Sequence, residues 1–575
     1  MKYVSPLKKY RTVYLTVMLL FMTTENEAQL SGIKNIPGDY ATIVAAVTDL
    51  NSQGVGVGGV TFNVAAAYTE SIISPILLIA TGTASNQIIF QKNGAGDNPK
   101  VTRTDAGTLT TSILGGQGDA VIIIQGSDYV TFNGIDVSAS NQGVEYGYYL
   151  RKVNGTNGCK NVSLNNSTIT MTKGTSAFVV GIFVSNNNSS TAVSNSTGVT
   201  VTSATGRHDS VIVQNNTIQN VFTGIVAIGY NNSSETSEDL YDHSMIGGSV
   251  GTGNIIQNFG GNAASLSYGI YAKNQRNFSV THNTMNNMSG GGSGFTAGGN
   301  GLYIEGGYNE NVQNNSITLT STSGKLRGIE SLPRRGDGVT TNNLISLSQN
   351  SSFEVTHIYY SQHIVPNSIT INNNTLSYGS PISVNQSSYM IYLNTTCSAI
   401  TSSGNQSSGT SNITLTAPTP VIYSMYFRAN FLDPPVTGTE TISNNTFSDF
   451  IFTVPDAGIN VFAIYGIFSS SNTGVKTCSS NSVSNVSLAA GKHCQIYGYR
   501  FLGNVMQIND NAFHGISTTS VSGSINVFGI QTESVVGTAE IYRNQCYDIS
   551  SKSYFCGIWS ESVMSTIYQN RIYDV

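Results

Sequence analysis

The chain has 575 residues, of which only 10% are charged, and its formal net charge is −5. This balance lacks the basic surface that nucleic acid requires, so we expect no nucleic-acid partner. Glycine contributes 60 residues, while 39% of the chain is hydrophobic. A turn-rich chain of low charge disfavours long helices and suits many short strands around a core.

Residues 1–28 have the pattern of a secretory signal peptide. A basic start precedes the mostly apolar run Val13–Met22, and Ala28 before Gln29 provides a cleavage site. The run is short for a bilayer span and no later segment approaches the needed length, so we do not expect an integral membrane protein. Cleavage near Ala28 would leave residues 29–575 as a secreted or cell-surface protein with a net charge of −7.

Residues 37–64 are expected to form an N-terminal cap and the first strand. Ile43, Ala46, Val47 and Leu50 are spaced i, i+3, i+4 and i+7, which predicts an amphipathic helix over residues 41–50. Such a helix would cover the open apolar end of a repeat structure. Strands are predicted at 60–64, 88–90, 121–124 and 129–137, and the last has the clearest alternation of polar and apolar residues.

Asparagine recurs in one local frame, in which it is followed by any residue and then an apolar one, about every 30 residues. The frame is present at Asn216, Asn283, Asn315, Asn343, Asn374, Asn445, Asn481, Asn511, Asn544 and Asn570. Looser forms are present at Asn133, Asn166, Asn254 and Asn405. Asn side chains can donate and accept hydrogen bonds and tolerate left-handed turns, so we interpret this column as a structural ladder between stacked coils.

A second frame, a small residue followed by an apolar one, runs out of phase with the first. It is present at Gly269, Gly301, Gly328, Gly466, Gly498, Gly529 and Gly557. Two interleaved apolar stretches per period, each bounded by polar turns, predict one turn of a β-solenoid.

The segment Pro37–Glu70, with "DYATIVAAVTDL" and "GGVTFNVAAAYTE", resembles the opening of secreted right-handed parallel β-helix proteins of Gram-negative bacteria. The stretch "DYVTFNGIDV" and the repeated "NNxI" frames resemble the coils of that class, whose fold is pectate-lyase-like. The resemblance implies an all-β, single-stranded right-handed parallel β-helix of about fourteen to sixteen coils with a short capping helix. It also implies a surface-protein module of the type often exported by type IX secretion.

Proteins of this type frequently carry a C-terminal sorting domain, whereas this sequence ends in mid-coil at Val575. The last coil, with Tyr568–Val575, is therefore expected to be incomplete and to expose a sheet edge. We expect either that the natural chain continues beyond Val575 or that a partner covers this end.

The residue that follows the apolar position of the glycine frame should point out of the solenoid, because side chains alternate along a strand. Coil by coil this position holds Tyr271, Tyr303, Glu330, Tyr359, Tyr392, Tyr426, Phe468, Arg500, Gln531 and Trp559. Stacked aromatic residues stabilise a sheet by themselves. The alternative is a ligand-binding strip for a glycan, formed by Tyr271, Tyr303, Tyr359, Tyr392, Tyr426 and Phe468, since sugar rings stack on aromatic faces.

Two groups of charged residues are candidates for chemistry. Glu235, Glu238, Asp239, Asp242 and His243 could hold Ca²⁺, with Glu238, Asp239 and Asp242 as candidate ligands, but they lack the spacing of a dedicated calcium loop. A solvated polar loop is the alternative, and we otherwise expect no cofactor.

The second group is Arg334, Arg335 and Asp337, with Glu330 just upstream. An acid and a base on one loop would suit an elimination reaction, with Glu330, Arg335 and Asp337 as candidate catalytic residues, although the glycines here equally mark an ordinary turn. The two groups are about three coils apart, so we expect that they do not form one active site.

Six cysteines in an exported chain could pair, and the local candidates are Cys478 with Cys494 and Cys546 with Cys556. The alternative is six small core residues.

For the whole chain we expect a non-catalytic extracellular module for adhesion or glycan contact. The competing function is that of a polysaccharide lyase or glycoside hydrolase acting on acidic polysaccharide, and the secretory signal disfavours a trimeric phage tailspike.

Overall fold

The computed structural model describes residues 29–575 apart from short internal segments, and the predicted signal peptide therefore lies outside the described residues. The segments left out are 109–118, 175–178, 191–197, 232–239, 262–264, 334, 350–352, 362–366, 380–381, 385, 396, 416–420, 430–437, 455–461, 471–473, 491–492, 504, 521–522 and 534–536.

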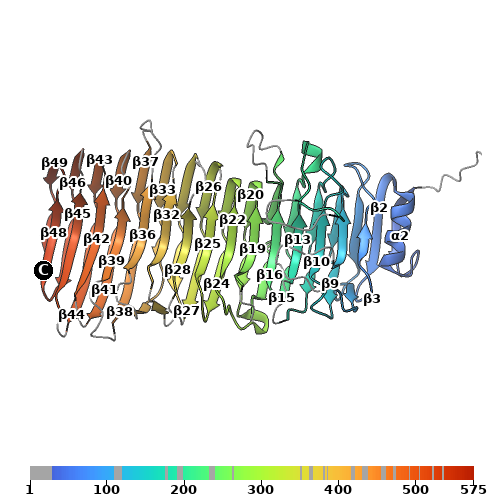
Figure 1. Cartoon of the computed structure of the whole chain (residues 1–575), viewed down its shortest axis with the longest axis horizontal. Coiled ribbons are helices and arrows are strands. Elements are labelled where there is room, and N and C mark those ends of the chain that lie inside the picture. Colours follow the sequence, from blue (N-terminus) through green and yellow to red (C-terminus); the bar gives the residue numbers. More distant parts are fainter. Residues whose placement is uncertain are drawn as a thin grey trace, which may run out of the picture.

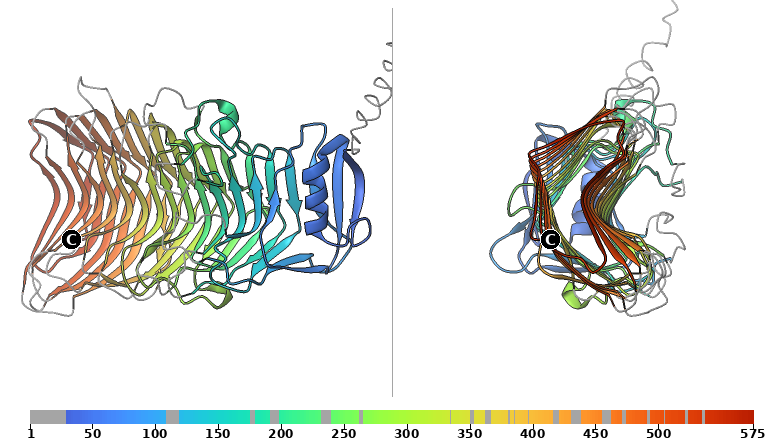
Figure 2. Two further views of the ribbon diagram at one scale, coloured as in Figure 1. Left: turned by 45° about the vertical axis from the view of Figure 1, so that its right-hand side comes forward. Right: turned by 90° about the vertical axis from the view of Figure 1, so that its left-hand side faces the viewer.

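The chain forms a parallel β-solenoid of about fourteen turns, which confirms the predicted fold class. A typical coil gives one strand to each of three sheets in the order A, B, C, and each strand pairs in parallel with its counterpart in the next coil. In Figure 1 the strands of sheet A are labelled along the top, those of sheet C in the middle and those of sheet B along the bottom. Viewed from the C-terminal end, the coils overlie one another closely (Figure 2, right).

The strands of sheet A are β1 (Leu30–Ile36), β2 (Val55–Ala65), β5 (Ile88–Asn93), β8 (Val130–Asn133), β11 (Val162–Asn165), β14 (Val211–Gln214), β17 (Ser244–Gly247), β20 (Arg276–Thr281), β23 (Tyr308–Gln313), β26 (Arg335–Thr341), β29 (Ser368–Asn372), β33 (Ala399–Ser403), β37 (Thr439–Ser443), β40 (Val475–Ser479), β43 (Val505–Asn509), β46 (Thr538–Tyr542) and β49 (Met564–Tyr568).

Sheet B consists of β3 (Thr69–Ile72), β6 (Lys100–Arg103), β9 (Asp136–Ala139), β12 (Thr168–Thr170), β15 (Thr217–Val221), β18 (Ile255–Phe259), β21 (Thr284–Asn286), β24 (Ser316–Ser321), β27 (Leu344–Gln349), β30 (Thr375–Tyr378), β31 (Ile382–Val384), β34 (Gln406–Ser407), β35 (Ser411–Leu415), β38 (Thr446–Thr453), β41 (Ser482–Ala490), β44 (Ala512–Ser520), β47 (Gln545–Ser550) and β50 (Arg571–Tyr573).

Sheet C consists of β4 (Ile76–Leu78), β7 (Ala120–Gln125), β10 (Tyr146–Arg151), β13 (Val180–Ser185), β16 (Thr223–Ile228), β19 (Ser267–Lys273), β22 (Gly299–Glu305), β25 (Leu326–Leu332), β28 (Val355–Ser361), β32 (Ser388–Thr395), β36 (Val421–Ala429), β39 (Phe462–Ser469), β42 (Cys494–Leu502), β45 (Ile525–Glu533) and β48 (Tyr554–Ser560). Two 3₁₀ turns, η1 (Ala204–Gly206) and η3 (Ser289–Gly291), lie in connections.

Helix α2 (Ile43–Gln53) lies across the N-terminal end of the solenoid, as the left view of Figure 2 shows, and it confirms the predicted helix. The four predicted apolar residues are the ones that it buries. Thr42 accepts a hydrogen bond from the Ala45 amide, and Glu70 of β3 accepts from the amides of Ile43 and Val44. These bonds satisfy the free amides of the first helical turn.

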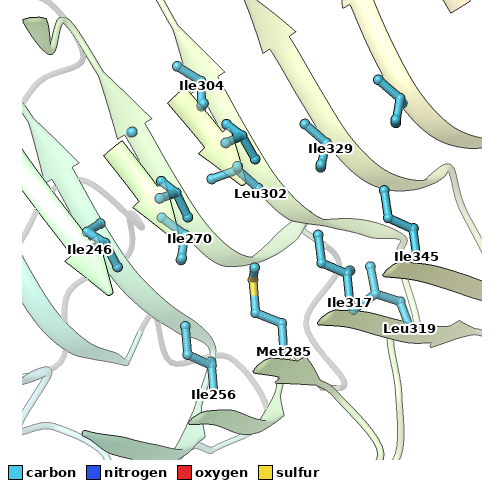
Figure 3. Packing of buried hydrophobic residues seen from close by; sticks show 14 of the residues in the cluster. Ile246, Ile256, Ile270, Met285, Leu302, Ile304, Ile317, Leu319, Ile329 and Ile345 are labelled. Carbon is cyan, nitrogen blue, oxygen red and sulfur yellow. The ribbon is translucent and has the colours of Figure 1, made fainter. Parts of the chain in front are cut away.

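The interior is a continuous column of aliphatic side chains contributed by all three sheets. Figure 3 shows the packing in the middle coils, where Ile270 and Leu302 of sheet C meet Met285 and Ile317 of sheet B. The glycines of the second frame sit where these sheets come together. A Cβ atom on Gly301 would lie 2.5 Å from Cγ2 of Ile317, so no larger residue fits there without a shift.

The predicted strand over residues 129–137 is wrong as a single element. Residues 130–133 form β8 in sheet A and residues 136–139 form β9 in sheet B. The chain turns between them at Gly134, whose φ is +70°. The alternation shifts phase at this corner, since the buried apolar residues are Val130 and Phe132 before it and Ile135 and Val137 after it.

Twelve of the predicted asparagines form one hydrogen-bonded ladder at the corner between sheets A and B, which confirms its structural interpretation. Each side-chain amide donates to the Oδ1 atom of the next asparagine at 2.9–3.1 Å. The same Oδ1 atom accepts from the backbone amide of the preceding asparagine at 2.9–3.1 Å. The ladder runs through Asn216, Asn254, Asn283, Asn315, Asn343, Asn374, Asn405, Asn445, Asn481, Asn511, Asn544 and Asn570.

Two details of this prediction are corrected. The left-handed conformation falls on the residue before the ladder position, such as Asn342 with φ +56°, and not on the ladder asparagine itself. Asn133 and Asn166 do not belong to the ladder, because the ladder positions of their coils are taken by Ile135 and Ser167. The Ser167 amide donates to Asn216, so the ladder begins one coil after Asn166.

Candidate binding face on sheet C

On the outer side of sheet C, side chains that are three residues apart and flank the glycine frame share one face of the strand. In β19, Tyr268 and Tyr271 lie three residues apart, yet their rings meet edge to face with centroids 5.0 Å apart. In a regular strand, residues i and i+3 would point to opposite sides of the sheet. The same contact recurs between Tyr389 and Tyr392, where Met390 holds the glycine position, so both rings lie on one face of the strand whether or not a glycine stands between them.

The predicted outward column is confirmed by the strand register. Tyr271 aligns with Tyr303, and the column continues through Glu330, Tyr359, Tyr392, Tyr426, Phe468, Arg500, Gln531 and Trp559. Tyr303, Tyr359, Tyr392, Tyr426 and Phe468 are half-buried, whereas Tyr271 has only 7% of its surface exposed. Tyr271 therefore does not belong to a solvent-facing strip, because neighbouring aromatic side chains cover it.

A second aromatic column, missed in the sequence analysis, runs beside the first. It holds Tyr268, Asn300, Arg327, Thr356, Tyr389, Tyr423, Tyr465, Tyr497, Phe528 and Cys556 in register. The sequence signal for it is an aromatic residue directly before the glycine position. The signal does not by itself predict a second outward column, because residues three apart are not expected to share one face of a strand.

The rings of both columns are stacked face to face along the solenoid axis. Tyr359 and Tyr392 have centroids 4.6 Å apart and an interplanar angle of 4°, and Tyr423 and Tyr465 are 4.8 Å apart at 7°. The faces of these rings are consequently occupied by their neighbours. The ring edges and the phenol hydroxyls are the parts that remain available to a ligand, which corrects the expectation that sugars would stack on exposed ring faces.

The hydroxyl groups of this face are neutral hydrogen-bonding groups. The structure records no hydrogen bond from the hydroxyls of Tyr423 and Tyr426 to another described residue, whereas the Tyr497 hydroxyl donates to Gln495 at 3.0 Å. Burial raises the pKa of Tyr497 to about 12. A row of such groups can donate to and accept from a polyhydroxylated ligand without carrying charge.

A charged cluster, which we call the charged break, interrupts the second column at β22 and both columns at β25. It consists of Lys273, Asn300, Glu305, Arg327, Glu330 and Glu354. Arg327 binds Glu354 at 2.8 Å and also binds Glu330. Lys273 binds Glu305 at 2.7 Å, and the Asn300 amide donates to Glu330 at 2.7 Å.

Arg327 also packs against the first ring of the aromatic stack, which begins with Tyr359 in the next coil. Its guanidinium carbon lies 3.6 Å from the ring centroid of Tyr359. Burial alone would lower the pKa of Arg327, but the carboxylates of Glu330 and Glu354 raise it above its ordinary value. The guanidinium is therefore a permanent cation that covers the exposed end of the ring stack.

The structure separates the candidate catalytic residues of the sequence analysis. Glu330 lies on sheet C in the charged break, whereas Arg335 and Asp337 lie on sheet A in β26. Asp337 is exposed and accepts a hydrogen bond from Ser368 at 2.7 Å. Arg334 lies outside the described residues. The chain turns a corner between Glu330 and Arg335, so Glu330 does not share a loop with Arg335 and Asp337, which lie together in β26.

The candidate calcium ligands are only partly within the described residues. Glu235, Glu238 and Asp239 lie outside them. Asp242 is fully buried and binds Lys152 at 2.7 Å, and His243 binds Asp209 at 3.2 Å. Within the described ranges, no group of three or more histidine, cysteine or acidic residues is arranged to hold a metal ion. Strand register places β17, which follows Asp242, three coils before β26, as expected for two separate clusters.

The cysteines agree with the alternative in which they are small core residues and not disulfide partners. All six are free thiols and five are buried, with only Cys556 partly exposed. Cys478 and Cys494 lie in sheets A and C, and Cys546 and Cys556 lie in sheets B and C.

Of the helices that the structure describes, none is long and apolar enough to cross a bilayer.

No protein-family model matches the chain, and no curated protein matches it. Among solved structures it is similar to the Agl-KA catalytic domain (12% identity, TM-score 0.24), covering 92% of this chain but only 66% of that one. It is also similar to the PL6 family alginate lyase AlyGC (9% identity, TM-score 0.24, 94% and 99% covered). A third match is PfbA, a surface adhesin of Streptococcus pneumoniae (12% identity, TM-score 0.25, 85% and 88% covered). At these TM-scores the matches do not distinguish between activities, so function has to be inferred from the chain's own residues.

Proposed function

We propose that the mature chain is a secreted, non-catalytic module that binds an extended, neutral glycan along the outer face of sheet C. The observation that carries this proposal is the pair of aromatic columns from β28 to β45. Their rings line up along the solenoid axis in consecutive coils. The rings from β28 to β39 are half-buried, apart from Tyr465, which is buried like Tyr497 and Phe528 in the coils that follow. The signal-like segment before Gln29 supports the extracellular location.

The spacing of the columns suits a polymer that lies parallel to the axis. Strands of adjacent coils are about 4.8 Å apart, and sugar units of an extended glycan repeat at about 5 Å, so one unit would meet one coil. Because the ring faces are covered, each contact would be a hydrogen bond to a phenol hydroxyl and an apolar contact with a ring edge. Each would be weak, and affinity would arise from several acting together.

Two triple variants test this proposal. Changing Tyr359, Tyr392 and Tyr426 to Phe removes the hydroxyls but keeps the ring stack, whereas changing them to Ser removes both. On an array of extended glycans we expect about a tenfold loss of affinity for the Phe variant, or about 1.4 kcal/mol, and complete loss for the Ser variant. The melting temperature of the Phe variant should hardly change.

The matched control is the double variant Tyr542→Phe and Tyr568→Phe. These rings are also stacked, at 5.0 Å, but they lie on sheet A. The control should bind as the natural protein does. Unchanged glycan binding by the folded Ser variant would contradict the proposal and leave the columns with a purely stabilising role.

The second candidate function is a polysaccharide lyase or glycoside hydrolase, and the charged break is the observation that favours it. Three carboxylates and two cations meet there on one face. However, Glu330 and Glu354 both bind Arg327, and Glu305 binds Lys273 and accepts from the Tyr303 hydroxyl. Each carboxylate is thus held by a cation, which opposes a role as general base. Turnover of a polyuronide that is abolished by Glu330→Gln would establish the enzyme and reject the binding module.

A further inference from the structure

The corner between sheets C and A contains a buried polar cluster that the binding face does not use. Lys152, His208 and Asp242 occupy this corner in three consecutive coils, after β10 and before β14 and β17. The side chains of Lys152 and Asp242 are fully buried, and Nζ lies 2.7 Å from Oδ1. The Lys152 side chain therefore extends past the coil that contains His208 and contacts Asp242 in the coil after it.

The hydrogen bonds of this pair fit two neutral groups better than two ions. An ammonium group has three donors, but Nζ makes one hydrogen bond to another described residue, the bond to Asp242. Oδ1 of Asp242 also accepts from the His208 backbone amide at 2.9 Å, while Oδ2 is buried and has no partner among the described residues. Burial lowers the pKa of Lys152 and raises that of Asp242, which favours a neutral amine beside a protonated carboxyl group.

We infer that Lys152 and Asp242 condense into an intramolecular isopeptide bond. Nζ of the neutral amine attacks Cγ of the protonated carboxyl group, and an N–Cγ bond forms while the Cγ–Oδ2 bond breaks. Oδ2 leaves as water, carrying the carboxyl proton and one proton from the amine. The reaction neither oxidises nor reduces either group and needs no co-reactant.

The surroundings suit this reaction at two points. The His208 amide holds Oδ1, the oxygen that gains negative charge during attack and remains as the amide carbonyl. The atom that leaves is Oδ2, which is the buried oxygen without a partner. Condensation therefore removes an unsatisfied polar atom and keeps the satisfied one.

Lys273 and Glu305 provide an internal comparison. Their nitrogen–oxygen distance is also 2.7 Å, but their side chains are 14% and 26% exposed. Water solvates both charges there, so this pair should remain ionic. The proposed bond would join the first and third of three successive coils covalently at one corner, whereas the Lys273–Glu305 pair would leave its coils unlinked.

Mass spectrometry of the folded natural protein tests the inference directly. Uncleaved Lys152 should join tryptic peptides 152–160 and 208–273 into one branched product. This product should be about 18 Da lighter than the sum of the two peptides, the mass of one water. Lys273 and Glu305 should appear only in linear peptides.

Lys152→Arg is the control variant, because it keeps a long side chain with nitrogen donors but cannot form this amide; its peptides should be linear. If linear peptides with free Lys152 and unmodified Asp242 account for the folded natural protein, the pair is joined by a hydrogen bond alone and the inference is wrong. The analysis of the natural protein decides this even if the variant does not fold.

Discussion

Two columns of side chains run along the solenoid and differ in their burial and in how strictly each keeps one residue type. The asparagine ladder is buried and keeps the same residue in twelve successive coils, from Asn216 to Asn570. The outer column of sheet C is half-exposed and admits Glu330, Arg500 and Gln531 among its aromatic residues. Each ladder asparagine satisfies both of its neighbours, so a substitution leaves buried polar groups without partners. In the coil where Glu330 takes the place of a ring in the outer column, Arg327 of the second column covers Tyr359 of the next coil.

The largest expected effect comes from breaking the ladder at Asn343. Its side chain donates to the Val312 carbonyl and to Asn374, and it accepts from the backbone and side-chain amides of Asn315. Asn343→Ala should lower the free energy of unfolding by about 3–4 kcal/mol, since several buried groups lose their partners. Chemical denaturation followed by circular dichroism measures this loss.

Asn342→Gly is the matched control for that variant. Asn342 is adjacent in the sequence but lies outside the ladder, and its φ of +56° suits glycine. Its substitution should cost less than about 1 kcal/mol. Equal losses for the two variants would mean that the ladder bonds do not stabilise the fold.

A buried carboxyl group outside the ladder shows what a buried polar group costs when it is not fully hydrogen-bonded. Glu310 accepts one hydrogen bond, from Ser331, while its Oε1 atom has no partner among the described residues. Burial raises its pKa from 4.5 to about 7. The folded protein therefore retains a proton that the unfolded chain releases, and stability should fall as the pH rises from about 4.5 to about 7, by on the order of 3 kcal/mol.

Glu310→Gln should remove this dependence, because glutamine stays neutral. Its melting temperature should exceed that of the natural protein at pH 8 and match it at pH 4.5. Glu540→Gln, at an exposed position on sheet A, provides the control and should change neither value. A natural protein that is equally stable at both pH values would show that Glu310 titrates normally.

The smallest stability effect is expected in the aromatic column. Tyr392 stacks on Tyr359 at 4.6 Å and on Tyr426 at 5.1 Å. Tyr392→Leu keeps an apolar side chain, so its cost should be limited to the two ring contacts, about 1 kcal/mol. Thermal unfolding measures it, and a loss as large as that of Asn343→Ala would make this column as essential to the fold as the ladder.

The fold could be predicted from the sequence because each coil repeats the same constraints. The asparagine frame, the glycine frame and the helix from Ile43 to Leu50 are local patterns with a physical cause. The second aromatic column could not be predicted from the alternation of a regular strand, because residues three apart share one face in these strands. The charged break combines Arg327, Glu330 and the more distant Glu354, and only the register of neighbouring coils brings Lys273 beside Glu305. Corner contacts such as Lys152 with Asp242 join residues 90 positions apart and leave no local signal.

The most direct test of the central claim is the affinity of the protein for neutral, extended oligosaccharides of increasing length. If the half-buried rings from β28 to β39 bind one sugar unit per coil, the affinity should rise with each added unit up to about four units, the number of coils that they span, and then level off. Isothermal titration of such a series would measure this directly. An affinity that does not depend on length, or a protein that binds none of the series, would contradict the account.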